Sequence, residues 1–290
     1  KLSDYYQVKV WENEAKPPQE VLEREISDSD ALISLVSDNL DSELLCKGKK
    51  LKIISQYAVG YNNVDLIEST RRGIYVTNTP DVLTNTTADY AFTLLMGIAR
   101  HISEADKYVK DKNWKLDWHP NMFTGNDIYG ATIGILGLGR IGKAMAKRCE
   151  GFDMEITYYD VYRDEEFEKK FNAKYKELED LFKESDFISI HTPLNEDTYH
   201  LVSEKLLRVM KKESYIINTA RGPIINHVDL YKALKNKWIS GAALDVHEEE
   251  PVRDDYPLFE LDNVILTPHI ASASYKTRIE MANIVMNNLI

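Results

Sequence analysis

The chain has 290 residues, of which 43% are hydrophobic and 29% charged, a composition typical of a folded protein rather than a disordered one. The formal net charge of -11 argues against a nucleic-acid partner, because phosphate contacts need clustered Lys and Arg. The two cysteines, Cys46 and Cys149, lie far apart and suggest neither a disulfide framework nor a metal site. No apolar run is long enough to cross a membrane. We therefore expect a two-domain protein of a reducing compartment, the cytoplasm.

The first part of the chain alternates short apolar runs with amphipathic stretches, which is typical of β–α units and a parallel sheet. Strands are expected at residues 31–37, 52–56 and 74–77. Helices are expected around residues 19–26 and 64–72, and Gly73 is placed to stop the second one.

A long helix is predicted to begin near Thr86. Thr86 and Asp89 have the spacing of a capping box, and apolar residues then repeat at helical intervals as far as Ile102. The segment 114–130, which is rich in aromatic and turn residues, breaks this rhythm. We expect it to cross between domains or subunits.

The alternation of strands and helices restarts at Ala131. Strands are expected at residues 132–136, 155–159, 187–190, 215–218, 239–244 and 264–266. Helices are expected at residues 141–149, 176–183, 204–210 and 228–235. Six strands in this order predict a doubly wound parallel sheet.

A G-x-G-x-x-G motif follows the first strand of this second part. Gly137 permits a tight turn, Gly139 lets the backbone approach a pyrophosphate, and Gly142 lets helix and strand pack closely. The helix N-terminus then offers free N–H groups and a positive dipole to the phosphates, and Arg140 can add charge. Three glycines alone also fit an ordinary tight turn that binds no cofactor. The residues around the motif must therefore decide between the two interpretations.

Asp160, at the end of the next strand, supplies that setting. An acid at this distance is expected to meet the ribose hydroxyls of a dinucleotide. Because a carboxylate repels a 2′-phosphate, we predict that NAD(H) is preferred. Arg163 lies close enough in sequence to leave some NADP(H) use open. Without the glycine motif, Asp160 would be interpreted as a turn residue.

In a doubly wound sheet, ligands bind at the edge formed by the carboxyl ends of the strands. The residues that directly follow the predicted strands are therefore candidates for the site. In chain order the strands are followed by Gly137, Asp160, His191, Ala220-Arg221, Asp245 and His269. Reduction of a keto acid needs a cation for the carboxylate, a proton donor for the carbonyl oxygen, and a partner that orients the donor. An arginine, a histidine and a carboxylate suit these tasks.

Arg221, His269 and Glu250 are the candidates for these three roles. Taken singly, each has a simpler interpretation: a surface arginine, a structural histidine, and one member of the solvated acidic run 248–250.

Several motifs in a fixed order carry a family resemblance. They are residues 57–65, 72–80, 137–142, 219–222, 244–251 and 267–269. Over nearly its whole length the chain resembles the D-isomer specific 2-hydroxyacid dehydrogenases, and among them the archaeal glyoxylate reductases. The resemblance implies NADH-dependent reduction of a small 2-keto acid, glyoxylate or hydroxypyruvate, by a homodimer.

The resemblance also implies a role for individual residues. Arg221 would anchor the substrate, His269 would protonate the keto oxygen, and Glu250 would support His269. The backbone N–H groups of Val59 and Gly60 would hold the substrate carboxylate from the other domain. The cofactor would be bound by Gly137, Leu138, Gly139, Arg140, Ile141, Gly142, Asp160, His191, Thr219, Ala220 and Asp245.

The implied fold is two Rossmann-like, doubly wound parallel-sheet domains with a cleft between them. The substrate domain would comprise residues 1–83 and 274–290, and the NAD-binding domain residues 84–273. The chain departs from the similar reductases by lacking a first strand and helix, by stopping inside a last helix, and by having Asp160-Val161 in place of a Ser-Arg pattern. We expect a trimmed chain.

Two alternatives stay open. One keeps the fold and changes the substrate, giving a D-lactate, D-glycerate or phosphoglycerate dehydrogenase. The other is an NAD(H)-sensing, corepressor-like binding protein, which can retain the same Arg, Glu and His.

Overall fold

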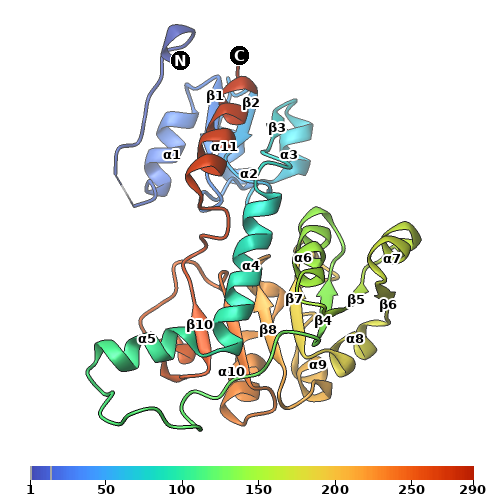
Figure 1. The fold of residues 1–290 in the computed structure, drawn as a ribbon. Helices are drawn as coiled ribbons and strands as arrows, with labels where there is room; N and C mark the ends of the chain where they lie inside the picture. Colours follow the sequence, from blue (N-terminus) through green and yellow to red (C-terminus); the bar gives the residue numbers. More distant parts are fainter. Residues whose placement is uncertain (1, 14) are drawn as a thin grey trace. The chain divides into compact units, whose positions relative to one another are not determined.

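The computed structural model describes residues 2–13 and 15–290. It divides into two compact units, shown in Figure 1: unit 1 comprises Lys1–Leu83 and Ala273–Ile290, and unit 2 comprises Thr84–Ser272. Each unit is built on a parallel sheet, so the expected α/β class is confirmed. No helix of the described residues is long and apolar enough to cross a membrane.

Unit 1 has a three-stranded sheet in the order β1-β2-β3, with both strand pairs parallel. Its strands are β1 (Ala31–Ser34), β2 (Ile53–Gln56) and β3 (Tyr75–Thr77). Its helices are α1 (Gln19–Ile26), α2 (Ser42–Lys47), α3 (Leu66–Arg71) and α11 (Tyr275–Asn287), with a short 3-10 helix at Leu2–Asp4. Aspartates cap two of them: Asp41 accepts from Leu44 N at 2.9 Å, and Asp65 accepts from Glu68 N at 2.8 Å.

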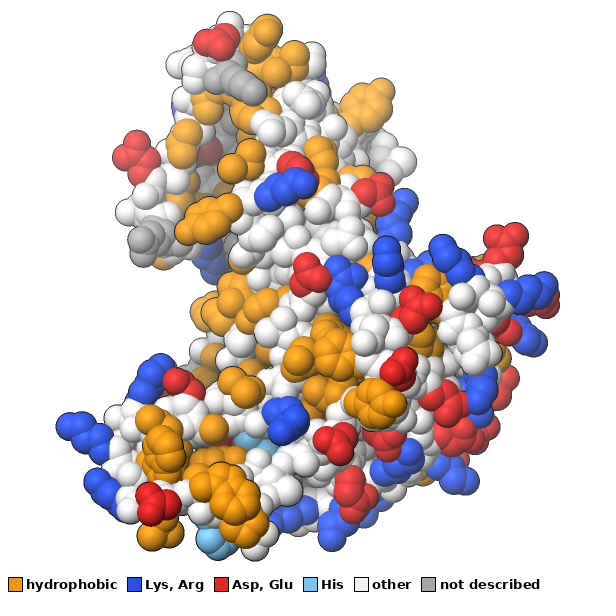
Figure 2. Space-filling model, in the orientation of Figure 1, with side chains coloured by type: hydrophobic (Ala, Val, Ile, Leu, Met, Phe, Trp, Pro, Cys, Tyr) orange, Lys and Arg blue, Asp and Glu red, His pale blue; other side chains and the backbone are white. Residues whose placement is uncertain are grey.

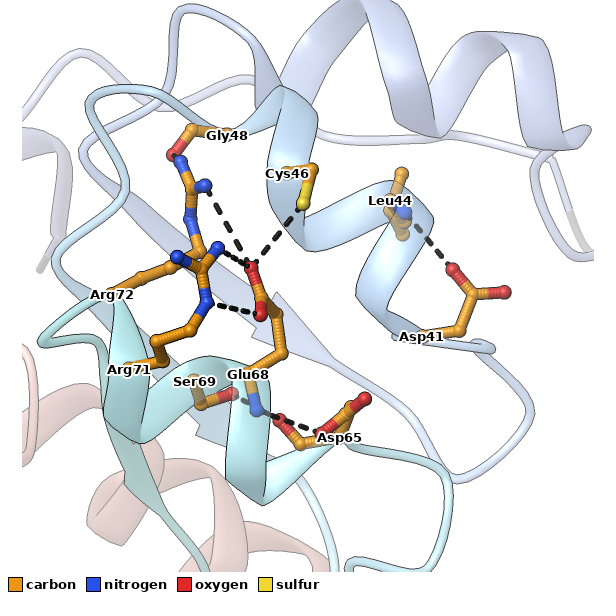
Figure 3. A network of polar contacts seen from close by, with 9 residues as sticks. All are labelled: Asp41, Leu44, Cys46, Gly48, Asp65, Glu68, Ser69, Arg71 and Arg72. Atoms are coloured by element: carbon orange, nitrogen blue, oxygen red, sulfur yellow. Dashed lines mark hydrogen bonds and ion pairs between the residues drawn. The ribbon is translucent and has the colours of Figure 1, made fainter.

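A polar network in unit 1 centres on the nearly buried Glu68 of α3 (Figure 3). Its carboxylate accepts two hydrogen bonds from Arg71, at 2.6 and 2.7 Å, and one from the Cys46 thiol at 3.2 Å. Arg72 lies 3.8 Å away and adds a second positive charge. These contacts hold the pKa of Glu68 down at about 2, and they tie α3 to α2.

Unit 2 has a seven-stranded parallel sheet in the order β10-β9-β8-β7-β4-β5-β6. Its strands are β4 (Thr132–Leu136), β5 (Glu155–Tyr159), β6 (Lys174–Tyr175), β7 (Phe187–Ile190), β8 (Tyr215–Asn218), β9 (Gly241–Leu244) and β10 (Val264–Leu266). The strand order reverses between β4 and β7, and ligands bind at such a switch point in doubly wound sheets.

Helices cover both faces of the large sheet. One face packs against α4 (Thr84–Ala99) and α6 (Arg140–Glu150), and the other against α8 (Leu178–Glu184), α9 (Glu204–Val209) and α10 (His227–Lys235). The strand residues alternate between the two resulting cores: Ile133 and Ile135 lie in the first, and Leu136 in the second. Unit 2 also contains α5 (Ile102–Lys110), α7 (Glu165–Phe171), and 3-10 helices at Gly222–Ile224 and Pro257–Glu260.

The long helix differs from its prediction at both ends. It begins at Thr84, so Thr86 and Asp89 lie inside it, and the capping box predicted there is wrong. Asp89 instead accepts a hydrogen bond from Arg148 Nε of α6 at 2.7 Å. The helix ends at Ala99 because His101 adopts a left-handed conformation, with φ at 54°, before α5 begins.

The aromatic segment 114–130 was predicted to cross between domains or subunits. Both of its neighbours, α5 and β4, belong to unit 2, so a crossing between the two units is wrong. Three helices and one strand that the sequence reading missed are α2, α5, α7 and the two-residue β6. The sequence extended the long helix to Ile102, the first residue of α5, and α7 has only two apolar residues, Phe167 and Phe171, too few for a clear periodic pattern.

Candidate active site

The residues predicted to carry chemistry meet along one edge of the seven-stranded sheet. All of its strands are parallel, so their carboxyl ends share that edge. The polar residues that follow those ends are Asp160 after β5, His191 after β7, Thr219 to Arg221 after β8, Asp245 after β9, and Thr267 to His269 after β10. The glycine motif follows β4, at the switch point.

The three glycines of the motif have distinct geometries. Gly137 has φ at 94°, and a Cβ there would lie 2.6 Å from Thr192 N. A Cβ on Gly142 would lie 2.2 Å from the Gly137 carbonyl oxygen, so α6 packs closely on the turn. In contrast, a Cβ on Gly139 would meet nothing within 4 Å, which leaves open space above the backbone. This loop fits the approach of a pyrophosphate.

The first turn of the 11-residue helix α6 faces the same loop. Gly139 is its N-cap residue and provides no side-chain hydrogen bond to the helix N–H groups. Arg140 is exposed on the first turn, and Ile141 follows it half-buried. These N–H groups and the helix dipole suit a phosphate.

Asp160 supports the glycine loop as well as ending β5. Its Oδ2 accepts from Leu138 N at 2.7 Å. A hollow of about 480 Å³ lies beside it, lined by Leu138, Lys143, Asp160, Tyr162, Arg163, Asp164, Glu165 and Glu166. Arg163 donates to both carboxylate oxygens of Glu168, each at 2.8 Å. The guanidinium of Arg163 is therefore already engaged within the protein.

Two further predicted cofactor residues carry polar atoms at this edge. His191 Nε2 lies 2.8 Å from Ser189 Oγ, and burial lowers the pKa of His191 to about 3, so its ring is neutral near pH 7. Thr219 is 7% exposed, and its hydroxyl oxygen finds no partner among the described residues. A buried hydroxyl without a partner fits a site that a polar ligand completes.

His269 and Glu250 are hydrogen-bonded to each other. His269 Nδ1 lies 2.7 Å from Glu250 Oε2, and the two side chains are 29% and 34% exposed. Burial pushes the pKa of Glu250 upward, but its contacts with His269 and His247 together outweigh burial and hold that pKa below its usual value. Glu250 Oε1 also accepts from the backbone N–H of His247 at 2.9 Å.

Asp245 holds the loop that carries His269. Its buried carboxylate accepts from Thr267 Oγ1 at 2.7 Å, from Ile270 N at 2.9 Å and from Ala271 N at 2.7 Å. Its carbonyl oxygen accepts from His269 N at 2.8 Å. The sequence indicated this aspartate only as a cofactor residue. That contact stays a prediction, and the support of the His269 loop is an additional role.

Arg221 lies in a loop that Asn218 shapes. Asn218 Oδ1 accepts from Ala220 N and its Nδ2 donates to the Arg221 carbonyl oxygen, both at 2.9 Å. Burial lowers the pKa of the half-buried Arg221, and nearby Glu250 partly offsets that shift. The guanidinium stays charged at neutral pH, as arginine does in proteins. A Cβ on Gly222 would lie 1.9 Å from the His247 carbonyl carbon, so only glycine lets this loop approach the Glu250 loop.

Val59 and Gly60 follow β2 of unit 1. Their carbonyl oxygens accept from Asn78 Nδ2 at 2.9 Å and from Gln56 Nε2 at 3.3 Å, respectively. In the part of the chain that the structure describes, neither backbone N–H has an acceptor. Both are therefore free to bind an anion, and their predicted part in binding stays a prediction.

Sequence reasoning missed Asn218, Gly222 and His247. Asn218 carried a signal, because it is a polar residue at the end of the otherwise apolar strand β8. The roles of Gly222 and His247 depend on contacts between loops far apart in the chain, which a single sequence does not show. Within the described ranges, no group of three His, Cys, Asp or Glu side chains is arranged to hold a metal ion.

The chain is similar to known proteins in sequence and in fold. The family model of the D-isomer specific 2-hydroxyacid dehydrogenase NAD-binding domain matches residues 92–271. A glyoxylate reductase of Korarchaeum cryptofilum is 52% identical over 100% of this chain and 87% of its own length, and that of Pyrococcus horikoshii is 51% identical with the same coverage. A D-lactate dehydrogenase of Aquifex aeolicus, solved with NAD and lactic acid, superposes with a TM-score of 0.84 at 31% identity, covering 92% of this chain and 84% of that one. The chain thus belongs to the D-isomer specific 2-hydroxyacid dehydrogenase family.

Proposed function

We propose that this protein reduces glyoxylate or hydroxypyruvate to the matching 2-hydroxy acid, with NADH as the reductant. The observation that carries the proposal is the His269–Glu250 pair, 2.7 Å apart, on the sheet edge that also carries Arg221 and the glycine loop. The glyoxylate reductases that are 52% and 51% identical to the chain support the choice of a small 2-keto acid.

Each catalytic side chain has a task that its chemistry suits. Arg221 binds the substrate carboxylate through its planar fork of donors, and burial of the guanidinium strengthens that contact. His269 delivers the proton of Nε2 to the keto oxygen, because its Nδ1 is held by Glu250. When bound, the dihydronicotinamide supplies the hydride that the carbonyl carbon gains. Glu250 stabilises the charged imidazolium and fixes the orientation of the ring.

The glycine loop and Asp160 are proposed to hold the dinucleotide, with preference for NADH. The Asp160 carboxylate repels a 2′-phosphate, and Arg163 is already paired with Glu168 rather than available to attract one. We assign the NAD-binding role to unit 2, because residues 92–271 match the NAD-binding family model. Unit 1, with Val59 and Gly60, is then the substrate domain.

The experiment is oxidation of NADH followed at 340 nm with the purified protein. Glyoxylate, hydroxypyruvate, pyruvate and 3-phosphohydroxypyruvate are compared, and each is repeated with NADPH. The proposal predicts the highest kcat/KM for glyoxylate or hydroxypyruvate with NADH. Highest turnover of pyruvate or the phosphorylated acid would assign the D-lactate or phosphoglycerate type instead. No turnover of any of the four acids, in a protein that still binds NADH, would contradict the proposal that this protein is an enzyme of this substrate class.

We also propose that the protein works in the cytoplasm, where its two free thiols, Cys46 and Cys149, would stay reduced.

We further propose that the protein forms a homodimer. Figure 2 shows hydrophobic side chains gathered over the part of unit 2 that carries α5 and the following loop. The exposed residues there are Ile102, Val109, Trp114, Leu116, Trp118, Phe123 and Tyr129. Such a surface is typical of an interface. Analytical ultracentrifugation should show a dimer, which Trp118→Glu together with Leu116→Glu should weaken.

A further inference from the structure

His247 contacts all three loops that carry the candidate catalytic residues. Its backbone N–H donates to Glu250 Oε1 at 2.9 Å, and its ring Nε2 lies 3.0 Å from the carbonyl oxygen of Thr267, two residues before His269. Its carbonyl carbon lies against Gly222, the neighbour of Arg221, with no room for a Cβ between them. The residue is 8% exposed. Small displacements of His247 would therefore be transmitted to all three loops.

The hydrogen bonds of the His247 ring determine its tautomer. A carbonyl oxygen can only accept, so Nε2 must carry the proton that it shares with Thr267. In the neutral ring Nδ1 is then an acceptor, and the Tyr256 hydroxyl lies 3.4 Å from it. That hydroxyl oxygen also lies 2.6 Å from His227 Nδ1.

We propose that His247 is a positioning residue for the proton donor of this enzyme. Its ring fixes the Thr267 carbonyl, its backbone N–H fixes Glu250, and both constraints act on the His269–Glu250 pair. The Thr267 carbonyl fixes the tautomer of the ring, and the Tyr256 hydroxyl lies 3.4 Å from its other nitrogen. The proposal rests on the function proposed above, in that His269 is taken as the proton donor. A group that acts through orientation should change kcat more than substrate binding.

The kinetic test compares His247→Phe with His247→Gln. Phenylalanine removes both ring hydrogen bonds, and we expect kcat to fall about tenfold or more, since misplacement by about 1 Å can cost 10²-fold. The KM of the keto acid and the Kd of NADH should stay within roughly twofold of wild type, because Gly222 of the Arg221 loop packs against the His247 backbone, which the substitution keeps. Glutamine can donate to Thr267 and accept from Tyr256, so it should restore most of kcat.

His200→Gln is the matched control. Its ring pairs with Glu248 at 2.6 Å and contacts neither the Thr267 carbonyl nor Glu250, so kcat should stay unchanged. If His247→Phe does not fold, Tyr256→Phe takes its place, because it removes the hydroxyl that contacts His247 Nδ1 and should lower kcat at constant KM. Unchanged kcat in the phenylalanine variant, or an equal loss in the glutamine variant, would overturn the proposal.

A measurement without turnover separates this inference from the proposed function. In long-range ¹H–¹⁵N spectra of protein labelled at its seven histidines, His247 should be the Nε2–H tautomer. The His269 signals should shift in His247→Phe and stay in His200→Gln. The reverse tautomer of His247, or His269 signals unaffected by His247→Phe, would refute the positioning role. If those signals shift while wild type reduces no keto acid, the positioning of His269 stands and the proposed substrate class fails.

Discussion

His269 Nδ1 lies 2.7 Å from Glu250 Oε2, and this pair decides which nitrogen of the histidine can meet a substrate. The Nδ1 proton is held by the carboxylate, so Nε2 is the nitrogen left to give a proton to a keto oxygen. The two residues come from loops after different strands, β9 and β10. Their distance therefore depends on the register of those strands and on the contacts that anchor each loop.

Glu250→Gln removes the negative charge while keeping the size of the side chain. We expect kcat to fall by about 10²-fold, the usual loss when a positioned acid–base group is disabled, because the imidazolium loses its counter-charge. The Kd of NADH should stay unchanged, since the glycine loop lies on a different strand end. Steady-state kinetics and a fluorescence titration with NADH measure the two effects.

Glu249→Gln is the control for that substitution, since Glu249 is the exposed neighbour of Glu250 in the acidic run. Its kinetics should match wild type. If both variants lose the same activity, the effect belongs to the charge of the run rather than to the His269 pair. Loss of NADH binding in Glu250→Gln would also contradict the assigned role.

Arg221→Lys keeps the charge and removes the planar fork of donors. We expect the KM of the keto acid to rise tenfold or more, because a charge-assisted hydrogen bond is worth about 1.5–3 kcal/mol. kcat should fall as well if the same contact tightens in the transition state. Arg253→Lys is the matched control, since Arg253 is an exposed arginine paired with Asp255, and it should leave both constants unchanged. An unaltered KM for Arg221→Lys would remove this residue from the site.

The sequence predicted the strands of the second unit closely, because five of them are buried on both faces and read as short apolar runs ended by polar residues. The same alternation placed Asp160, Arg221 and His269 directly after strands, and parallel pairing brought them to one edge. α7, which has only two apolar residues among charged ones, gave too little pattern to predict.

The contacts that hold the site together could not be predicted in the same way. His247 lies within three residues of Glu250, yet its ring bonds to Thr267, twenty residues further along the chain. Asp245 looked like a ligand contact, and the structure shows its carboxylate bonded to the backbone and hydroxyl of the His269 loop. Contacts of this kind arise only when two loops meet in space, and no local periodicity encodes them.

Asp160→Ser and Asp160→Asn separate the two roles of Asp160. Both remove the charge that repels a 2′-phosphate, so the ratio of kcat/KM for NADPH over NADH should rise by about tenfold or more, which corresponds to about 1.4 kcal/mol of relieved repulsion. Asparagine can still accept from Leu138 N, as Asp160 Oδ2 does at 2.7 Å, whereas serine is too short. The serine variant should therefore bind both cofactors more weakly than the asparagine variant.

Glu179→Gln is the control for cofactor choice, since Glu179 is an exposed carboxylate of α8 that does not line the hollow. It should leave the cofactor ratio unchanged. A ratio that does not move in either Asp160 variant would refute the assignment of Asp160 to the ribose. Equal cofactor affinities for the serine and asparagine variants would show that the bond to Leu138 contributes nothing to the loop.

Glu68 should make the stability of unit 1 depend on pH in acid. Hydrogen bonds from Arg71 and Cys46 hold its pKa at about 2, below the usual 4.5. A carboxylate with a lowered pKa stabilises the folded state fully above the unfolded pKa, and that stabilisation is lost as the pH falls through the folded value. The free-energy advantage of wild type over Glu68→Gln should thus be constant above about pH 5.5, shrink below 4.5 and vanish near pH 2.

Urea unfolding of both proteins at a series of pH values measures this difference, with circular dichroism as the signal. Glu43→Gln is the matched control: Glu43 is 83% exposed and lies 4.0 Å from Lys47, so its removal should cost little stability at any pH. A pH-independent difference between wild type and Glu68→Gln would show that the carboxylate acts by packing alone. A difference that grows toward low pH would reverse the sign of the linkage and contradict the network around Glu68.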